Sequence, residues 1–206
     1  EHSWRLALMA LLVADEFPDV DCGRVVRMCL VHDLGEAFTG DIPAFEKRRQ
    51  DETHEAALLA RWVETLPEPL RAEWRSLYAE MEALATPEAR LYKALDKLEA
   101  VIQHNEADIA TWLPLEYDLN IAYGADEVAW NGYLRRLKEA ANEISRQKIR
   151  TFSLAFPASS GFTTFWHQKV VPKASARRNR RGPTVVLFPA FSQGRVRGAL
   201  SRNRDY

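Results

Sequence analysis

Length, composition and charge place this chain among globular proteins and argue against a membrane-spanning one. It has 206 residues, of which 47% are hydrophobic, enough to bury a sizeable core in one domain with an appendage. The longest apolar runs, residues 6–14 and 185–190, are far shorter than the roughly 20 residues that a membrane-spanning helix requires. We therefore expect no contact with a membrane.

The net charge of −1 conceals a strong asymmetry between the two ends of the chain. From Arg150 onward there are eleven Lys or Arg residues and one acidic residue, whereas the first 149 residues hold 17 basic and 28 acidic residues. We expect a folded domain over residues 1–150 and a basic tail over residues 151–206.

In chain order, apolar residues that recur every three or four positions predict a helical bundle, with prolines at the joints. Leu91, Leu95, Leu98 and Ile102 form the clearest series, and the preceding Thr86-Pro87-Glu88 is typical of a helix cap, a first-turn proline and an acidic first turn. Strand patterns are nearly absent, so the predicted fold is all-α with about six helices. The helices are expected at residues 3–16, 23–39, 45–65, 68–84, 87–110 and 126–150.

Beyond Arg150 the helical pattern gives way to Phe, Ser, Gly, Pro and Arg, with a basic run at residues 177–181. The high net charge and the turn-forming residues favour a disordered tail. A basic patch with aromatic residues can instead bind nucleic acid through phosphate contacts and base stacking. A third interpretation is that the tail is not native, because a shifted reading frame would produce such an abrupt loss of acidic residues.

The two cysteines, Cys22 and Cys29, lie seven residues apart on one apolar stretch. This spacing matches neither a disulfide framework nor a zinc knuckle, so we expect reduced core thiols in a cytoplasmic protein. The chain begins with Glu1 rather than Met, inside what looks like a motif, so we also expect a truncated N-terminus.

The adjacent pair His32-Asp33 is the centre of the candidate functional site. His2 lies upstream of it, and Asp96 lies on a later apolar segment where a buried charge is costly unless it is paired or metal-bound. Imidazole and carboxylate groups together form a mixed nitrogen and oxygen donor set suited to a divalent metal ion. The pattern indicates metal-assisted hydrolysis.

Two further carboxylates follow the pair closely. On a continuous helix, Glu36 would lie one turn along the face that carries His32 and Asp33, and Gly35 would leave that face uncrowded. The turn that begins at Gly40 could bring Asp41 back over the same pocket.

Each of these residues has an ordinary structural alternative. His2 could be a solvated residue at a terminus, and Asp96 could form an ion pair with the neighbouring Lys97. Glu36 and Asp41 would then be helix and turn residues without chemistry. Two more histidines have no partner at ligand spacing and are expected to have no chemical role: His54 and His104.

Four segments together resemble the HD-domain superfamily of metal-dependent phosphohydrolases. The string HD-x-x-E-x(3)-G-D-I-P is similar to the 5′-deoxynucleotidase branch of that superfamily. The His-Asp pair alone is weak evidence, but the ordered set over about 95 residues is fairly specific, and the resemblance covers residues 1–150 without extending to the tail. The segments are Glu1-His2-Ser3, His32-Asp33-Leu34-Gly35-Glu36, Thr39-Gly40-Asp41-Ile42-Pro43 and Ala94-Leu95-Asp96-Lys97-Leu98.

The resemblance implies that one divalent ion, manganese, cobalt, magnesium or iron, has four protein ligands: His2, His32, Asp33 and Asp96. It also implies that water and a substrate phosphate oxygen fill the open positions, and that an arginine and an aromatic residue upstream of the first histidine orient the phosphate. Because this chain starts at Glu1, those two residues are missing from it, and we expect it to hydrolyse nucleotides poorly.

The same resemblance assigns catalysis to Glu36 and Asp41, which in related members also hold a second ion. Asp41, Ile42, Pro43 and Ala44 match a loop that contacts the substrate. Ala44 departs from relatives that carry a hydroxyl residue there, which puts one substrate hydrogen bond in doubt.

The expected activity is metal-dependent hydrolysis of (deoxy)nucleoside 5′-monophosphates to nucleoside and phosphate, with a small-molecule nucleotide as partner. A homodimer is plausible because helix faces are apolar. One alternative is another HD-type hydrolase that acts on a nucleoside triphosphate, a guanosine polyphosphate or a phosphodiester. The contrasting alternative is a non-enzymatic helical module whose basic tail binds nucleic acid. A redox di-iron enzyme is disfavoured, because the additional histidines for a second iron are not evident.

Overall fold

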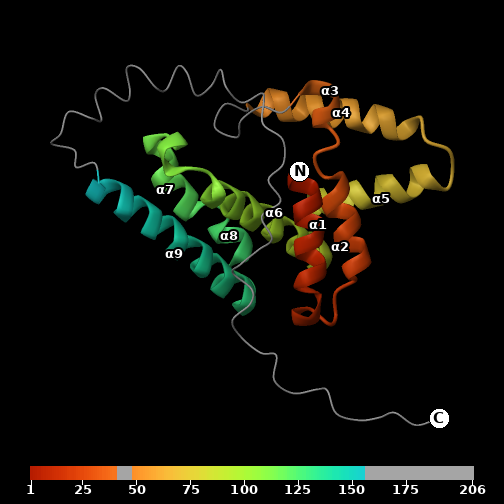
Figure 1. Ribbon diagram of the computed structural model, residues 1–206. Helices are drawn as coiled ribbons and strands as arrows, with labels where there is room; N and C mark the ends of the chain where they lie inside the picture. Colours follow the sequence, from red (N-terminus) through yellow and green to blue (C-terminus); the bar gives the residue numbers. More distant parts are fainter. Residues whose placement is uncertain (41–47, 156–206) are drawn as a thin grey trace, which may run out of the picture. The chain divides into compact units, whose positions relative to one another are not determined.

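The computed structural model describes residues 1–40 and 48–155, and every regular element in them is helical (Figure 1). No strand occurs within these two ranges, so the predicted all-α fold is confirmed. None of the helices described there is both long and apolar enough to cross a membrane. In chain order the elements are α1 (His2–Leu12), η1 (Ala14–Glu16), α2 (Cys22–Val31), α3 (Glu36–Thr39), α4 (Arg49–Glu64), α5 (Leu70–Ala83), α6 (Pro87–Glu106), η2 (Ile109–Thr111), α7 (Pro114–Ala122), α8 (Ala125–Val128) and α9 (Gly132–Ala155).

Helix α6 is the central element, because it contacts α1, α2, α5, α7, α8 and α9. Ten of its 20 residues are buried, too many for a single amphipathic face, so the helix is enclosed on several sides. Its start follows the predicted cap: the Thr86 hydroxyl accepts a hydrogen bond from the Ala89 N–H at 3.2 Å, and Pro87 occupies the first turn.

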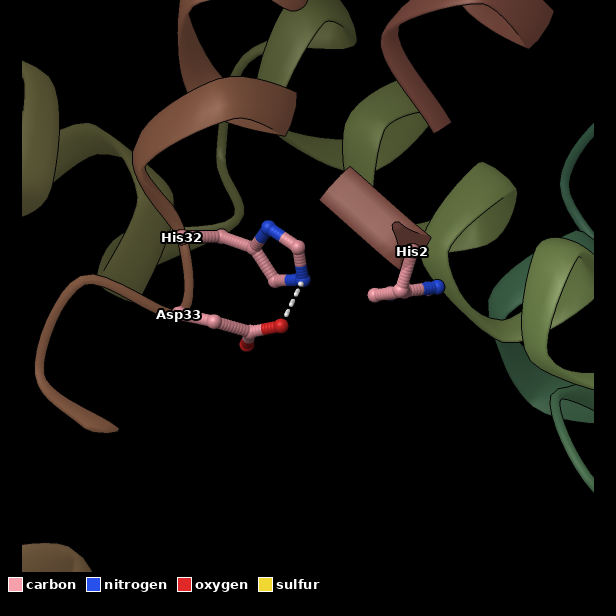
Figure 2. Close-up of side chains that lie close together, drawn as sticks. All are labelled: His2, His32 and Asp33. Carbon is pink, nitrogen blue, oxygen red and sulfur yellow. Dashed lines mark ion pairs between the residues drawn. The ribbon is translucent and has the colours of Figure 1, made fainter. Parts of the chain in front are cut away.

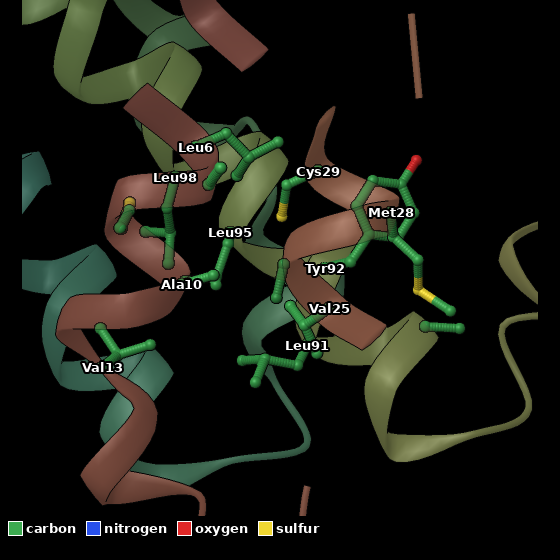
Figure 3. Packing of buried hydrophobic residues seen from close by; sticks show 14 of the residues in the cluster. Leu6, Ala10, Val13, Val25, Met28, Cys29, Leu91, Tyr92, Leu95 and Leu98 are labelled. Atoms are coloured by element: carbon green, nitrogen blue, oxygen red, sulfur yellow. The ribbon is translucent and has the colours of Figure 1, made fainter. Parts of the chain in front are cut away.

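Side chains of α1, α2 and α6 share one apolar core (Figure 3). Leu6 of α1, Val25 and Cys29 of α2, and Leu95 and Leu98 of α6 are completely buried. Burying such side chains is the main favourable contribution to folding. This packing places the first turn of α1 and the last turn of α2 beside the middle of α6.

The two cysteines are free thiols, as expected from their spacing. Cys29 is buried in the core, and burial raises the pKa of its thiol to about 12. Cys22 is only partly buried, so the description of a core thiol applies to Cys29.

The prediction of one continuous helix over residues 23–39 is wrong. Helix α2 ends at Val31, a turn follows, and α3 begins only at Glu36. Gly35 lies in that turn against α4, where a Cβ atom would be 2.6 Å from Cγ of Glu55. The expectation that Gly35 leaves the helix face of His32 and Asp33 uncrowded assumed a continuous helix; in the turn, the Glu55 side chain occupies the space beside Gly35.

Helix α7 was not expected from the sequence, and buried polar contacts hold it to α6 and α9. The Asn120 amide donates to Oδ1 of Asn105 at 3.2 Å and to the Ser145 hydroxyl at 3.0 Å. The Lys138 ammonium donates to the Asn120 carbonyl at 3.1 Å and to Oδ1 of Asn142 at 2.7 Å. Because these buried groups satisfy one another, the polar side chains of this region are compatible with a packed interior.

The other boundaries differ from the expected ones by a few residues. The first helix ends at Leu12 and continues as η1, and α6 ends at Glu106 rather than residue 110. The last helix starts at Gly132 and reaches Ala155, five residues beyond the expected end of the domain. The rest of the tail lies outside the described residues, as do the expectations attached to it.

Two leucines of α1 give a direct test of the core. Leu6→Ala should lower the free energy of unfolding by about 2–5 kcal/mol, because it leaves a cavity between α1 and its neighbours. Leu11→Ala is the matched control, since Leu11 is 57% exposed and its loss should change stability by less than about 0.5 kcal/mol. Urea unfolding followed by far-ultraviolet circular dichroism measures both. Equal losses would contradict the packing described here.

Candidate metal centre

His32 and Asp33 lie in the turn that connects α2 to α3. The expectation of two helical neighbours is corrected: His32 is the C-terminal cap of α2, and Asp33 follows it. The backbone N–H of Leu34 donates to the Val31 carbonyl at 3.1 Å, and that of Glu36 donates to the Asp33 carbonyl at 3.0 Å. These bonds fix the turn, so both side chains project from the end of α2 toward α1 and α6.

The two nitrogen atoms of the His32 ring have different environments. Nδ1 donates to the Cys29 carbonyl at 2.9 Å, so in the neutral form of the ring the lone pair is on Nε2. Nε2 is buried and makes no hydrogen bond to any described residue. Instead, Oδ2 of Asp33 lies 3.0 Å from it and Oδ1 of Asp96 lies 3.5 Å from it. A ring nitrogen in this position can bind a cation placed among the carboxylates.

His2 approaches the same point from the first turn of α1. Its Nε2 lies 3.1 Å from Oδ1 of Asp96, and its ring centroid is 5.2 Å from that of His32. Figure 2 shows His2 on its own helix beside the His32–Asp33 ion pair. Potential ligand atoms of His2, His32 and Asp33 all lie within 4.8 Å of one another. Residues far apart in the sequence thus meet at one small site.

Asp96 connects the two histidines to α6. It is only 7% exposed, with Oδ1 facing both imidazoles and Oδ2 lying 3.0 Å from the Lys93 ammonium and 3.5 Å from that of Lys97. Burial alone would raise the pKa of Asp96, but the two imidazoles and the nearby ammonium groups hold it well below its usual range. The ion pair with Lys97 therefore exists alongside the histidine contacts rather than in place of them.

The same carboxylates raise the pKa of both imidazoles. Burial opposes the charged form of His2, but hydrogen bonds to Asp96 and Glu99 raise its pKa to about 10. For His32, burial is again outweighed, here by Asp33 and Asp96, and the pKa rises to about 9. A site that attracts a proton this strongly at two nitrogens has the charge that a divalent cation requires.

The residues present fit a divalent metal ion. Two imidazole nitrogens and two carboxylates make the mixed donor set that such ions accept, and the buried Nε2 of His32 lacks another hydrogen-bond partner in the described part of the chain. The structure brings His2, His32 and Asp33 together as one group, and Asp96 contacts both imidazoles, while metal ligation itself stays a prediction.

The other expected site residues lie outside this group or outside the described residues. Glu36 is half-buried at the start of α3 and does not belong to the group formed by His2, His32 and Asp33. Its catalytic role stays a prediction. Four residues lie outside the described ranges, and so do the roles expected for them: Asp41, Ile42, Pro43 and Ala44.

Glu99 is a site residue that the sequence analysis missed. It is 2% exposed, its Oε2 contacts Nδ1 of His2, and its Oε1 lies 2.6 Å from Nε of Arg5. The available signal was its position one turn after Asp96 in the apolar series of α6, where a second buried carboxylate needs a partner.

The two histidines expected to have no chemical role lie apart from this cluster. His54 is exposed on α4. His104 stacks on Trp112, with ring centroids 4.1 Å apart and an interplanar angle of 30°.

Comparison with known proteins gives relatives for most of this domain. The 5′-deoxynucleotidase HDDC2 of Bos taurus is 36% identical over 108 residues, which are 52% of each chain, and that of Homo sapiens is 35% identical over the same length. The chain therefore spans about half the length of the curated relatives it matches. A crystal structure from Magnetospirillum magnetotacticum MS-1, described as a predicted metal-dependent phosphohydrolase, is 31% identical, with a TM-score of 0.59 over 72% of this chain and 76% of that one.

The family model described as HD domain matches residues 1–137, well over half of the chain. This range includes α1, the α2–α3 turn and α6, which carry all four expected ligands. The chain therefore belongs to the HD-domain family of phosphohydrolases.

Proposed function

We propose that this chain is a metal-dependent phosphomonoesterase that acts on (deoxy)nucleoside 5′-monophosphates. The observation that carries the proposal is the convergence of two imidazole Nε2 atoms and two carboxylates between α1, α2 and α6. The relatives named 5′-deoxynucleotidase support the substrate class. The products would be a nucleoside and inorganic phosphate.

In this proposal His2, His32, Asp33 and Asp96 hold one divalent ion. The ion would polarise the phosphate and lower the pKa of a coordinated water. Lys93 and Lys97, both beside Asp96, add positive charge next to the site and so favour a dianionic substrate.

Glu36 is proposed to handle the proton. Its position at the start of α3, three residues after Asp33, allows it to orient water or to pass a proton to the leaving 5′ oxygen. With water supplying the hydroxyl of the new phosphate, the P–O bond to the nucleoside breaks and the nucleoside oxygen is protonated.

Phosphate release from a panel of deoxy- and ribonucleoside monophosphates tests the metal site. Asp33→Ala should lower the rate by about 1000-fold or more, because metal coordination is worth several kcal/mol in the transition state. Asp19→Ala, which removes an exposed carboxylate in the η1–α2 connection, is the matched control and should have no effect. Chelation should abolish release, and manganese, cobalt, magnesium or iron should restore it.

The rates are compared between variants of this chain rather than in absolute terms. Release that resists chelation and survives Asp33→Ala would refute the proposal. Pyrophosphate or triphosphate as the product would instead support the other HD-type hydrolases.

Glu36→Gln separates proton transfer from metal binding. Phosphate release should fall by about 100- to 10,000-fold, the usual contribution of a general acid or base, while metal affinity stays unchanged. Isothermal titration with Mn²⁺ and a phosphate assay measure the two quantities. A loss of one bound ion per chain in this variant would show that Glu36 is a ligand of a second ion instead.

Deletion of residues 156–206 distinguishes the enzyme from the nucleic-acid-binding module. We expect the shortened chain to keep its phosphate release, because every described site residue lies in residues 1–155. The deletion begins after Ala155 so that α9 stays intact. Loss of a salt-sensitive affinity for RNA or DNA, with no phosphate release before or after the deletion, would favour the module.

A cytoplasmic location and a homodimer stay predictions. Neither contributes to the site geometry described above.

A further inference from the structure

The two histidines of the site are held by different means. His32 is fixed within its own segment, since its Nδ1 donates to the Cys29 carbonyl three residues earlier. Nδ1 of His2 instead contacts the carboxylate of Glu99, which lies 97 residues later on α6. In both rings Nδ1 is engaged away from the site, and Nε2 faces the carboxylates of the cluster. Glu99 therefore does for His2 what the Cys29 carbonyl does for His32: it holds Nδ1 of the ring.

We propose that Glu99 is a positioning residue that fixes the tautomer and the orientation of His2 for metal binding. Carboxylates face both nitrogens of this ring, Glu99 at Nδ1 and Asp96 at Nε2, and a carboxylate can only accept a hydrogen bond. When a cation takes the place of the proton on the Nε2 side, Glu99 keeps the remaining proton on Nδ1 and so leaves the lone pair on Nε2. That lone pair then points to the region shared with Asp96 and His32. The inference rests on the proposed metal site, and it concerns how this chain prepares one ligand.

Arg5 holds Glu99 in the required orientation. Its Nε lies 2.6 Å from Oε1 of Glu99, while the other carboxylate oxygen, Oε2, contacts His2. The two terminal nitrogens of Arg5 donate to Glu106 at 2.6 and 2.8 Å. Each oxygen of Glu99 thus has its own partner, and the carboxylate cannot rotate without losing both.

The arrangement also predicts what an amide would do in this place. In Glu99→Gln, Arg5 requires an acceptor, so the amide oxygen should face Arg5 and the amide NH₂ should face His2. An NH₂ group donates to Nδ1 and therefore stabilises the imidazole with its proton on Nε2, which has no lone pair there for a metal ion. The substitution preserves shape and favours the wrong tautomer.

Titration with Co²⁺, followed by its visible absorption and without any nucleotide, measures this effect. Glu99→Gln should weaken Co²⁺ binding by about 10- to 100-fold, the usual cost of removing such a partner of a ligating histidine. Glu106→Gln is the matched control, because Glu106 also pairs with Arg5 from α6 but is exposed and does not contact His2. It should bind Co²⁺ like the wild type. Unchanged affinity and spectrum in Glu99→Gln would overturn the inference.

A second measurement does not depend on the folding of the variant. In the wild-type chain with Zn²⁺, long-range ¹H–¹⁵N spectra of the histidine rings should show both His2 and His32 protonated at Nδ1 and bound through Nε2, with the His2 signals assigned by their absence in His2→Gln. Binding of His2 through Nδ1 would overturn the inference.

The outcomes for the two proposals can be told apart. If the wild type binds neither ion, both the proposed metal site and the role of Glu99 are refuted. If the wild type binds both Co²⁺ and Zn²⁺ but the two tests of Glu99 give the contrary results, the proposed metal site is kept and the positioning role of Glu99 is refuted.

Discussion

The buried carboxylate of Asp96 is the constraint around which this domain is arranged. A carboxylate with 7% exposure is costly unless cations or hydrogen-bond donors surround it. Here the groups around it come from three helices: His2 from α1, His32 from the end of α2, and Lys93 and Lys97 from α6 itself. The apolar core between these helices places their side chains around one point, so the packing that forms the core also assembles the site.

The C-terminal half of α6 takes part in a second buried polar cluster, made of amide and hydroxyl groups and one ammonium group. Around Asn105, amide, hydroxyl and ammonium groups from α7 and α9 satisfy one another, and no metal ion is required there. The two halves of one helix thus contain two kinds of buried polar cluster. The cluster near α9 is rich in donors and acceptors that match, whereas the cluster near α1 concentrates carboxylates beside imidazoles. That difference in donor chemistry is why we assign metal binding to the latter.

Local sequence patterns predicted much of the fold and little of the site geometry. The apolar series from Leu91 and the cap at Thr86 act within one helix, so they could be found without knowing the tertiary contacts. The turn after Val31 could not, because the contact of Gly35 with Glu55 involves a segment 20 residues away. Helix α7 was not predicted for the same reason, since Asn120 forms its hydrogen bonds with Asn105 and Ser145 on other helices.

For the site, the ordered motif indicated His2, His32, Asp33 and Asp96 as a set, but only the structure shows their distances. Glu99 could not be assigned, because its partners Arg5 and His2 lie more than 90 residues upstream. The periodic pattern of a helix indicates which of its residues are buried, but not which distant residues they contact.

The positions of the ligands along the chain have one more consequence. An ion bound to residues 2, 32, 33 and 96 would close two long loops at a single point, one between α1 and the end of α2 and one between that turn and α6. The unfolded chain would lose conformational entropy if it closed both loops around the ion, so the ion binds the folded chain in preference to the unfolded one. At a free ion concentration 100 times the dissociation constant, this linkage is worth about 2.7 kcal/mol. Ion binding at the site and the thermodynamic stability of the fold would then be linked.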